Sequence, residues 1–182
     1  MKLADALEMK FNEQITLEFE ASMTYRQLAI VADVQSFPGM AQWLRAQADE
    51  EIVHANKFID HVVDRGGHVQ IGDIPAPKVG VDMKPVDLFK AALAHEEKVS
   101  EAIRELYRAA DAQGDLDSRP LLNWFLDEQI EEEATVGEIV DQLVLAGDDG
   151  NGLLRLDAEL GSRTSSGTCL LYTSDAADDS LR

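Results

Sequence analysis

The stretch VQIGDIPAPKVG, residues 69–80, decides the fold because it interrupts a chain that is otherwise helical in its pattern. Gly72, Pro75 and Pro77 make it a loop, and it lies in a link of about 18 residues between two long helical segments. Such a link spans at most ~60 Å, whereas a helix of ~28 residues is roughly 42 Å long. The link can therefore run the full length of a helix bundle.

Four segments around this link repeat their apolar residues at steps of three and four, which is the period of an amphipathic α-helix. They cover roughly residues 5–34, 38–65, 85–114 and 118–146. Links of about five residues join the first two segments and the last two, so each pair forms an antiparallel hairpin. We expect an all-α four-helix bundle of two hairpins joined by the long crossover.

The C-terminal part follows a different pattern. LLRLDAELGS, residues 153–162, is amphipathic and predicts a short fifth helix. From Arg163 onward the chain shows no stable periodicity. We assign residues 1–161 to one domain and expect 162–182 to be a disordered tail, for which a non-native origin such as read-through is one explanation.

Composition limits the compartment and the partners. The 182 residues suffice for one domain with a sizeable core. No stretch reaches the ~18 apolar residues of a membrane span, and residues 1–14 carry acids where a secretory signal is apolar, so we expect a soluble cytoplasmic protein. The net charge of −19 argues against binding bare nucleic acid. Cys169 is the only cysteine, which excludes an intrachain disulfide.

A polar residue interrupts each apolar stripe near the middle of its helix. The interruptions are carboxylates, and residues at mid-height of bundled helices meet at one level. Burying unpaired carboxylates costs several kcal/mol, and no lysine or arginine stands on the stripes at that level, so a pair of metal ions is the economical partner. Carboxylates with one imidazole suit iron or manganese. The residues are Glu18, Glu51, Glu96 and Glu132, with His54 one turn after Glu51 and Gln129 one turn before Glu132.

The E-x-x-H spacing places Glu51 and His54 on one helix face, where they can hold one metal together while Glu51 bridges to a second. A single E-x-x-H is a weak signal, and Tyr25 and Trp124 are of types that more often pack in a core than react. What favours a metal site is that four helices each carry one acid at the same height.

At these residues the chain resembles the haem-free bacterial ferritins. The resemblance covers about residues 3–161. The motifs that carry it are FNEQITLEFEASMTY (11–25), ADEEIVHANKF (48–58), HEEK (95–98), WFLDEQIEEE (124–133) and LAGDDGNGLLRLDAEL (145–160).

The resemblance implies a role for each matching residue. A first iron would be held by Glu18, Glu51 and His54, and a second by Glu51, Glu96 and Glu132. Gln129 would lie close to the second iron, and Tyr25 would be the family's nearby tyrosine. A third iron position would be formed by Glu50, Glu128 and Glu131, which are alternatively three solvated acids.

The resemblance also implies a ferroxidase that oxidises Fe(II) with dioxygen or peroxide and stores ferric mineral in a shell of 24 subunits. The haem-binding bacterioferritins fit less well: Gln129-x-x-Glu132 stands where they carry a second E-x-x-H, and Ile52 stands where they carry the haem-ligating methionine. No haem is therefore expected. The mini-ferritins, which build their site between subunits, fit worse. Alternatives from other classes are a non-catalytic iron-binding shell subunit, a metal-free helical interaction module and a di-iron oxygenase.

Overall fold

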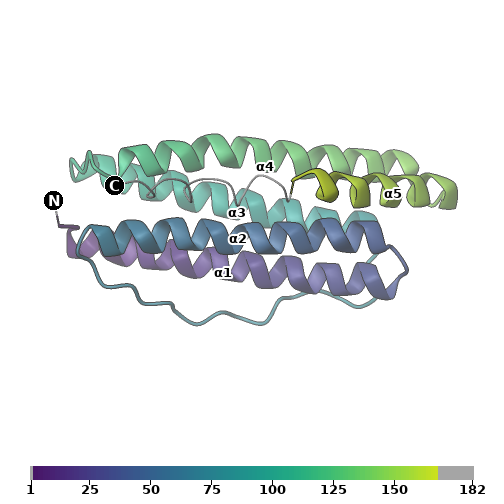
Figure 1. The fold of residues 1–182 in the computed structure, drawn as a ribbon, viewed down its shortest axis with the longest axis horizontal. Helices are drawn as coiled ribbons and strands as arrows, with labels where there is room; N and C mark the ends of the chain where they lie inside the picture. The colour runs from purple at the N-terminus through teal and green to yellow at the C-terminus, as the bar shows by residue number, and fades with distance from the viewer. Residues whose placement is uncertain (1, 168–182) are drawn as a thin grey trace, which may run out of the picture.

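The computed structural model describes residues 2–167 and contains no strand in that part of the chain. Its helices are α1 (Asp5–Val34), α2 (Pro38–Asp64), α3 (Pro85–Ala112), α4 (Arg119–Ala146) and α5 (Gly150–Gly167). The first four lie side by side along one long axis, and α5 packs on α2 and α4 (Figure 1). None of the described helices is both long enough and apolar enough to cross a membrane. The all-α bundle expected from the sequence is confirmed.

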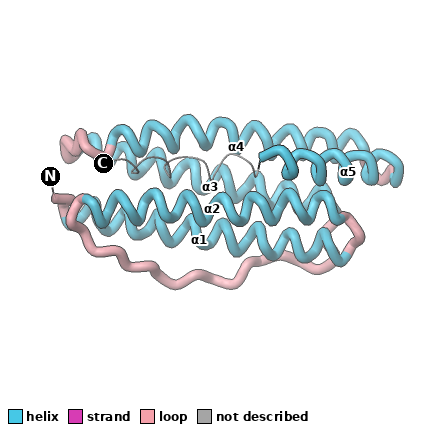
Figure 2. The backbone as a smooth tube through the Cα atoms, in the orientation of Figure 1, coloured by secondary structure: helices cyan, strands magenta, loops and turns pink. Residues whose placement is uncertain are grey.

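The crossover, residues 65–84, runs along the outside of the bundle from one end to the other (Figure 2). Polar side chains of α1 hold it in place. Asn12 donates to the carbonyl oxygen of His68 at 3.0 Å and accepts from the backbone of Gln70 at 3.2 Å. The hydroxyl of Thr16 accepts from the backbone of Gly72 at 2.9 Å. The two hairpins are therefore connected through a pinned loop and not through a further strand or helix.

The inward stripes form two apolar clusters with a polar layer between them. One cluster contains Tyr25, Leu44 and Leu160, and the other contains Phe11 and Phe58. The residues that interrupt the apolar stripes, Glu18, Glu51, His54, Glu96, Gln129 and Glu132, are all buried, whereas His61 near the end of α2 is half-buried. The polar layer is thus closed off from water on both sides by packed side chains.

Helix α5 is longer than the sequence pattern suggested, since it runs over Gly150–Gly167 and not 153–162. The carboxylate of Asp149 accepts from the backbone of Gly152 at 2.9 Å, which caps a glycine-rich first turn that lies outside the predicted helix. Near the other end, Arg163 pairs with Glu159 one turn earlier. The expected tail boundary at 162 therefore falls inside a helix, and residues 168–182, with Cys169, lie outside the described residues.

Helix α5 is docked through its contact with the start of α2. The side chain of Phe37 cannot cap α2, and the carboxylate of Asp157 accepts from the backbone of Met40 at 2.8 Å instead. The backbones approach so closely that a Cβ on Gly39 would lie 1.8 Å from the carbonyl oxygen of Asp157, and a Cβ on Gly161 would lie 3.1 Å from the Cα of Gly39. Only glycine permits this approach.

Candidate metal centre

Four carboxylates enter the polar layer, one from each long helix. Glu18 comes from α1, Glu51 from α2, Glu96 from α3 and Glu132 from α4. Each is at most 7% exposed. The apolar clusters on either side replace water around them, so the carboxylates lie in a medium that disfavours their charge.

Glu18, Glu51 and His54 form a group whose ligand atoms all lie within 4.8 Å of one another. Nδ1 of His54 lies 3.2 Å from Oε2 of Glu51, as expected for residues three apart on a helix. The imidazole packs edge-on against the rings of Trp124 and Phe125, with ring centroids 5.7 and 5.5 Å away. These rings restrict the orientation of a side chain that is 2% exposed.

Glu96 is fixed by hydrogen bonds to both of its oxygens. The hydroxyl of Tyr25 donates to Oε1 at 2.5 Å, and the amide of Gln129 donates to Oε2 at 3.2 Å. The same amide nitrogen lies 3.2 Å from the hydroxyl oxygen of Ser100. In this arrangement Gln129 and Tyr25 orient Glu96, and a metal ion would have to compete with these donors or share the oxygens with them.

A second group contains Glu50, His54, Glu128 and Glu132, again with ligand atoms within 4.8 Å of one another. Nε2 of His54 lies 4.0 Å from Oε1 of Glu128, so the two ring nitrogens of His54 face the two groups. Glu131, which the resemblance placed with Glu50 and Glu128, is exposed and outside this group. Its charge still helps to raise the pKa of Glu128, after the larger effect of burial.

The electrostatics of the layer favour protonated carboxyls when no cation is bound. Burial, helped by the nearby Glu96 and Glu50, raises the pKa of Glu132 to about 8. Burial and carboxylate neighbours also raise the pKa values of Glu18 and Glu51 well above the usual range. A divalent cation would remove the repulsion and displace these protons.

Two residues of this layer were not singled out by the sequence. Gln14 donates from its amide to Oε1 of Glu18 at 2.7 Å, and Ser100 shares the Gln129 amide with Glu96. Gln14 did carry a signal, because it interrupts the apolar stripe of α1 one turn before Glu18. Ser100 carried none, since a small hydroxyl side chain fits both buried and exposed positions.

The donor set suits a pair of hard or borderline divalent cations. It consists of carboxylate oxygens and one imidazole, without thiolate, which is the ligand type found for iron and manganese. Cations at adjoining positions could share carboxylates, and pairs of this kind support one-electron chemistry at each ion. The carboxylate–histidine groups are therefore candidate metal-binding groups in a dry environment.

Known proteins with this pattern were found by sequence and by structure. A family model described as a ferritin-like domain matches residues 8–146. The bacterial non-heme ferritin of Staphylococcus epidermidis is 37% identical over 162 residues, which are 89% of this chain and 97% of that protein. The one from Staphylococcus aureus is 35% identical over 153 residues, 84% and 92% of the two chains. The open-pore ferritin of Archaeoglobus fulgidus superposes with a TM-score of 0.85 at 34% identity, covering 88% of this chain and 98% of that one.

Proposed function

The chain belongs to the ferritin family. We propose that it oxidises Fe(II) to Fe(III) with dioxygen at the metal centre enclosed by helices α1, α2, α3 and α4, and that it stores the ferric product. Iron is then both substrate and cargo. The sequence resemblance, the match of nearly the whole domain and the carboxylate–histidine groups all support this assignment.

The observation that carries the proposal is the convergence of four buried carboxylates that have no lysine or arginine partner. Among residues 2–167 no ion pair joins Glu18, Glu51, Glu96 or Glu132 to a lysine or arginine. Such a group is costly as a purely structural feature, because apolar side chains of similar size would be more stable there. A group that is unfavourable for folding and suited to a cation is expected to be kept for binding that cation.

The ligand roles are those that the family resemblance implies, and the grouping of Glu18, Glu51 and His54 supports the first of them. We assign Glu18, Glu51 and His54 to the first Fe(II), and Glu51, Glu96 and Glu132 to the second. Gln129 and Tyr25 hold Glu96 in place from opposite sides. Each Fe(II) gives up one electron, and dioxygen takes both electrons with two protons to form hydrogen peroxide.

A third iron is proposed for the α2–α4 face, where Glu50 and Glu128 lie beside His54 and Glu132. Glu131 would join them only by turning inward from its exposed position. No haem is assigned to the chain, because Ile52, and not methionine, follows Glu51.

We also propose that 24 copies assemble into a shell. Support comes from solved ferritins of the same fold, one named as an open-pore form and one as an engineered closed form. The net charge of −19 fits this role, because an acidic shell raises the local concentration of Fe(II). The way in which the subunits pack decides which surfaces of the shell carry this charge.

Aerobic oxidation of Fe(II), followed by absorbance, tests the proposal. The wild-type chain is expected to oxidise about two Fe(II) per subunit in a fast phase, and Glu51→Ala/His54→Ala to lose that phase because both iron positions lose ligands. Asp127→Ala, which removes an exposed carboxylate on α4 outside both groups, should match the wild type. If the wild type only matches the protein-free rate, the centre is not a ferroxidase, and the chain is either a passive shell subunit or a metal-free helical module.

A further inference from the structure

Gln14 is a buried polar side chain that the assigned ligand set does not use. It lies on α1 one turn before Glu18, is 3% exposed, and donates to Oε1 of Glu18 at 2.7 Å. We propose that Gln14 is a positioning residue that holds one oxygen of Glu18, so that this carboxylate binds the first metal ion through its other oxygen alone. This inference rests on the proposed function, because it concerns the same first metal position.

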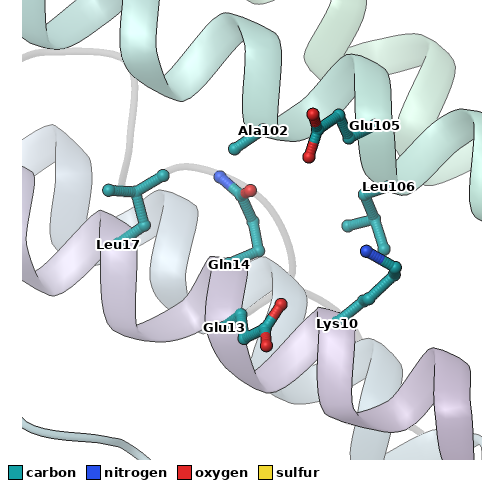
Figure 3. Close-up of a pocket in the computed structure, with 7 residues that line it drawn as sticks. All are labelled: Lys10, Glu13, Gln14, Leu17, Ala102, Glu105 and Leu106. Carbon is teal, nitrogen blue, oxygen red and sulfur yellow. The ribbon is translucent and has the colours of Figure 1, made fainter.

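The orientation of the Gln14 amide follows from chemistry. When a metal ion is bound, Glu18 is an ionised carboxylate that only accepts hydrogen bonds, so the NH₂ group of Gln14 must face Glu18 and its carbonyl oxygen must face away. The structure has this donor direction. Figure 3 shows this oxygen turned toward the side of a surface pocket where Glu105 and Leu106 lie. The amide thus connects the pocket between α1 and α3 with the buried carboxylate.

The pocket has room for water molecules that can donate hydrogen bonds to the carbonyl oxygen of Gln14. Its volume is about 100 Å³, which admits a few water molecules at ~30 Å³ each. Gln14 lines this pocket and also contacts Glu18, which is 0% exposed. The amide can therefore be fully hydrogen-bonded while its NH₂ group stays committed to Glu18. The remaining lining residues are Lys10, Glu13, Leu17 and Ala102.

The two oxygens of Glu18 are consequently unlike each other. Oε1 accepts from Gln14, whereas Oε2 is buried and has no hydrogen-bond partner within residues 2–167. Glu18 belongs to the group whose ligand atoms lie within 4.8 Å of Glu51 and His54. A carboxylate with one oxygen committed and one free is prepared to act as a single-oxygen ligand. Partners of this type typically change metal affinity by 10- to 100-fold.

The test uses Co(II), which binds such sites without reacting with dioxygen and whose visible absorption weakens as its coordination number rises. Gln14→Met removes the donor and keeps the volume, and Leu17→Met alters the same pocket wall but removes no hydrogen bond to Glu18. We expect Gln14→Met to bind the first Co(II) roughly tenfold more weakly, because the Glu18 carboxylate is no longer held in position. We also expect weaker absorption, because Glu18 can then bind Co(II) through both oxygens and raise its coordination number. Leu17→Met should keep the wild-type affinity and spectrum.

Wild-type affinity and spectrum in Gln14→Met would overturn the inference while leaving the proposed function intact. Failure of the wild type itself to bind Co(II) would instead overturn the proposed function, and the inference with it. Gln14→Leu serves as a second donor-free variant if Gln14→Met does not fold, with the same expected loss and the same contradicting result. If Gln14 had a purely structural role, its replacement would lower the stability of the protein but would not change the Co(II) spectrum.

Discussion

At the scale of single residues, the centre consists of carboxyls whose charge the surroundings oppose. Tyr25 and Gln129 each donate to one oxygen of Glu96, and these hydrogen bonds partly offset the rise of its pKa caused by burial. Burial also raises the pKa of Tyr25, so its hydroxyl remains a donor at neutral pH. The site is therefore ready to exchange protons for metal ions.

The first prediction concerns the pH dependence of the metal-free protein. Glu132 has a pKa of about 8 when folded, against an ordinary value near 4.5, so between these values the folded state holds a proton that the unfolded state has lost. The resulting stability is fully present below pH ~4.5 and is lost as the pH rises through about 8. In the presence of a chelator, we expect Tm to fall by roughly 10 °C between pH 5 and pH 8.

Glu132→Gln provides the matched control, because it removes this titration and leaves the net repulsion of the acidic chain nearly unchanged. Its Tm should depend less steeply on pH than that of the wild type. Saturating Co(II) should reverse the wild-type slope, since the metal binds the deprotonated carboxylates. If the Tm of the metal-free wild type rises from pH 5 to pH 8, the buried carboxyls are not protonated in the way that we propose.

At the scale of helices, the sequence pattern was sufficient to predict the bounds of a helix where its apolar stripe is long. The bounds of α1 match the prediction, Asp5–Val34, and the four stripe-breaking acids were visible because carboxylates are rare on an apolar face. The start of α5 was missed because Gly150 and Gly152 suggest a loop, and the Asp149 cap that offsets them is a matter of geometry. The Gln14–Glu18 hydrogen bond likewise depends on side-chain conformations that no spacing specifies.

Helix α5 gives the second prediction. In Gly39→Ala the new Cβ would lie 1.8 Å from the carbonyl oxygen of Asp157, so α5 must shift and weaken the cap on the Met40 backbone. We expect a loss of about 1–3 kcal/mol in the free energy of unfolding, measured by urea. Gly137→Ala on α4 meets nothing within 4 Å and should gain up to ~1 kcal/mol. Equal midpoints for Gly39→Ala and the wild type would rule out a tight α2–α5 contact.

At the scale of the whole molecule, the topology brings four distant segments to one level. Two short links make the hairpins, and the pinned crossover of residues 65–84 brings the second hairpin against the first. The apolar clusters above and below the polar layer then enclose it. This arrangement excludes water from the centre and sets its height within the bundle. The match to the ferritin family model and the superposition on solved ferritins cover the same bundle.

The central claim is that the bundle holds two iron ions between its long helices. Anomalous diffraction at the iron edge, from crystals soaked anaerobically in Fe(II), tests it most directly. We expect two iron positions in each subunit, one in contact with Glu18, Glu51 and His54 and one in contact with Glu51, Glu96 and Glu132. Iron bound only at exposed acids, with none among these residues, would contradict the assignment.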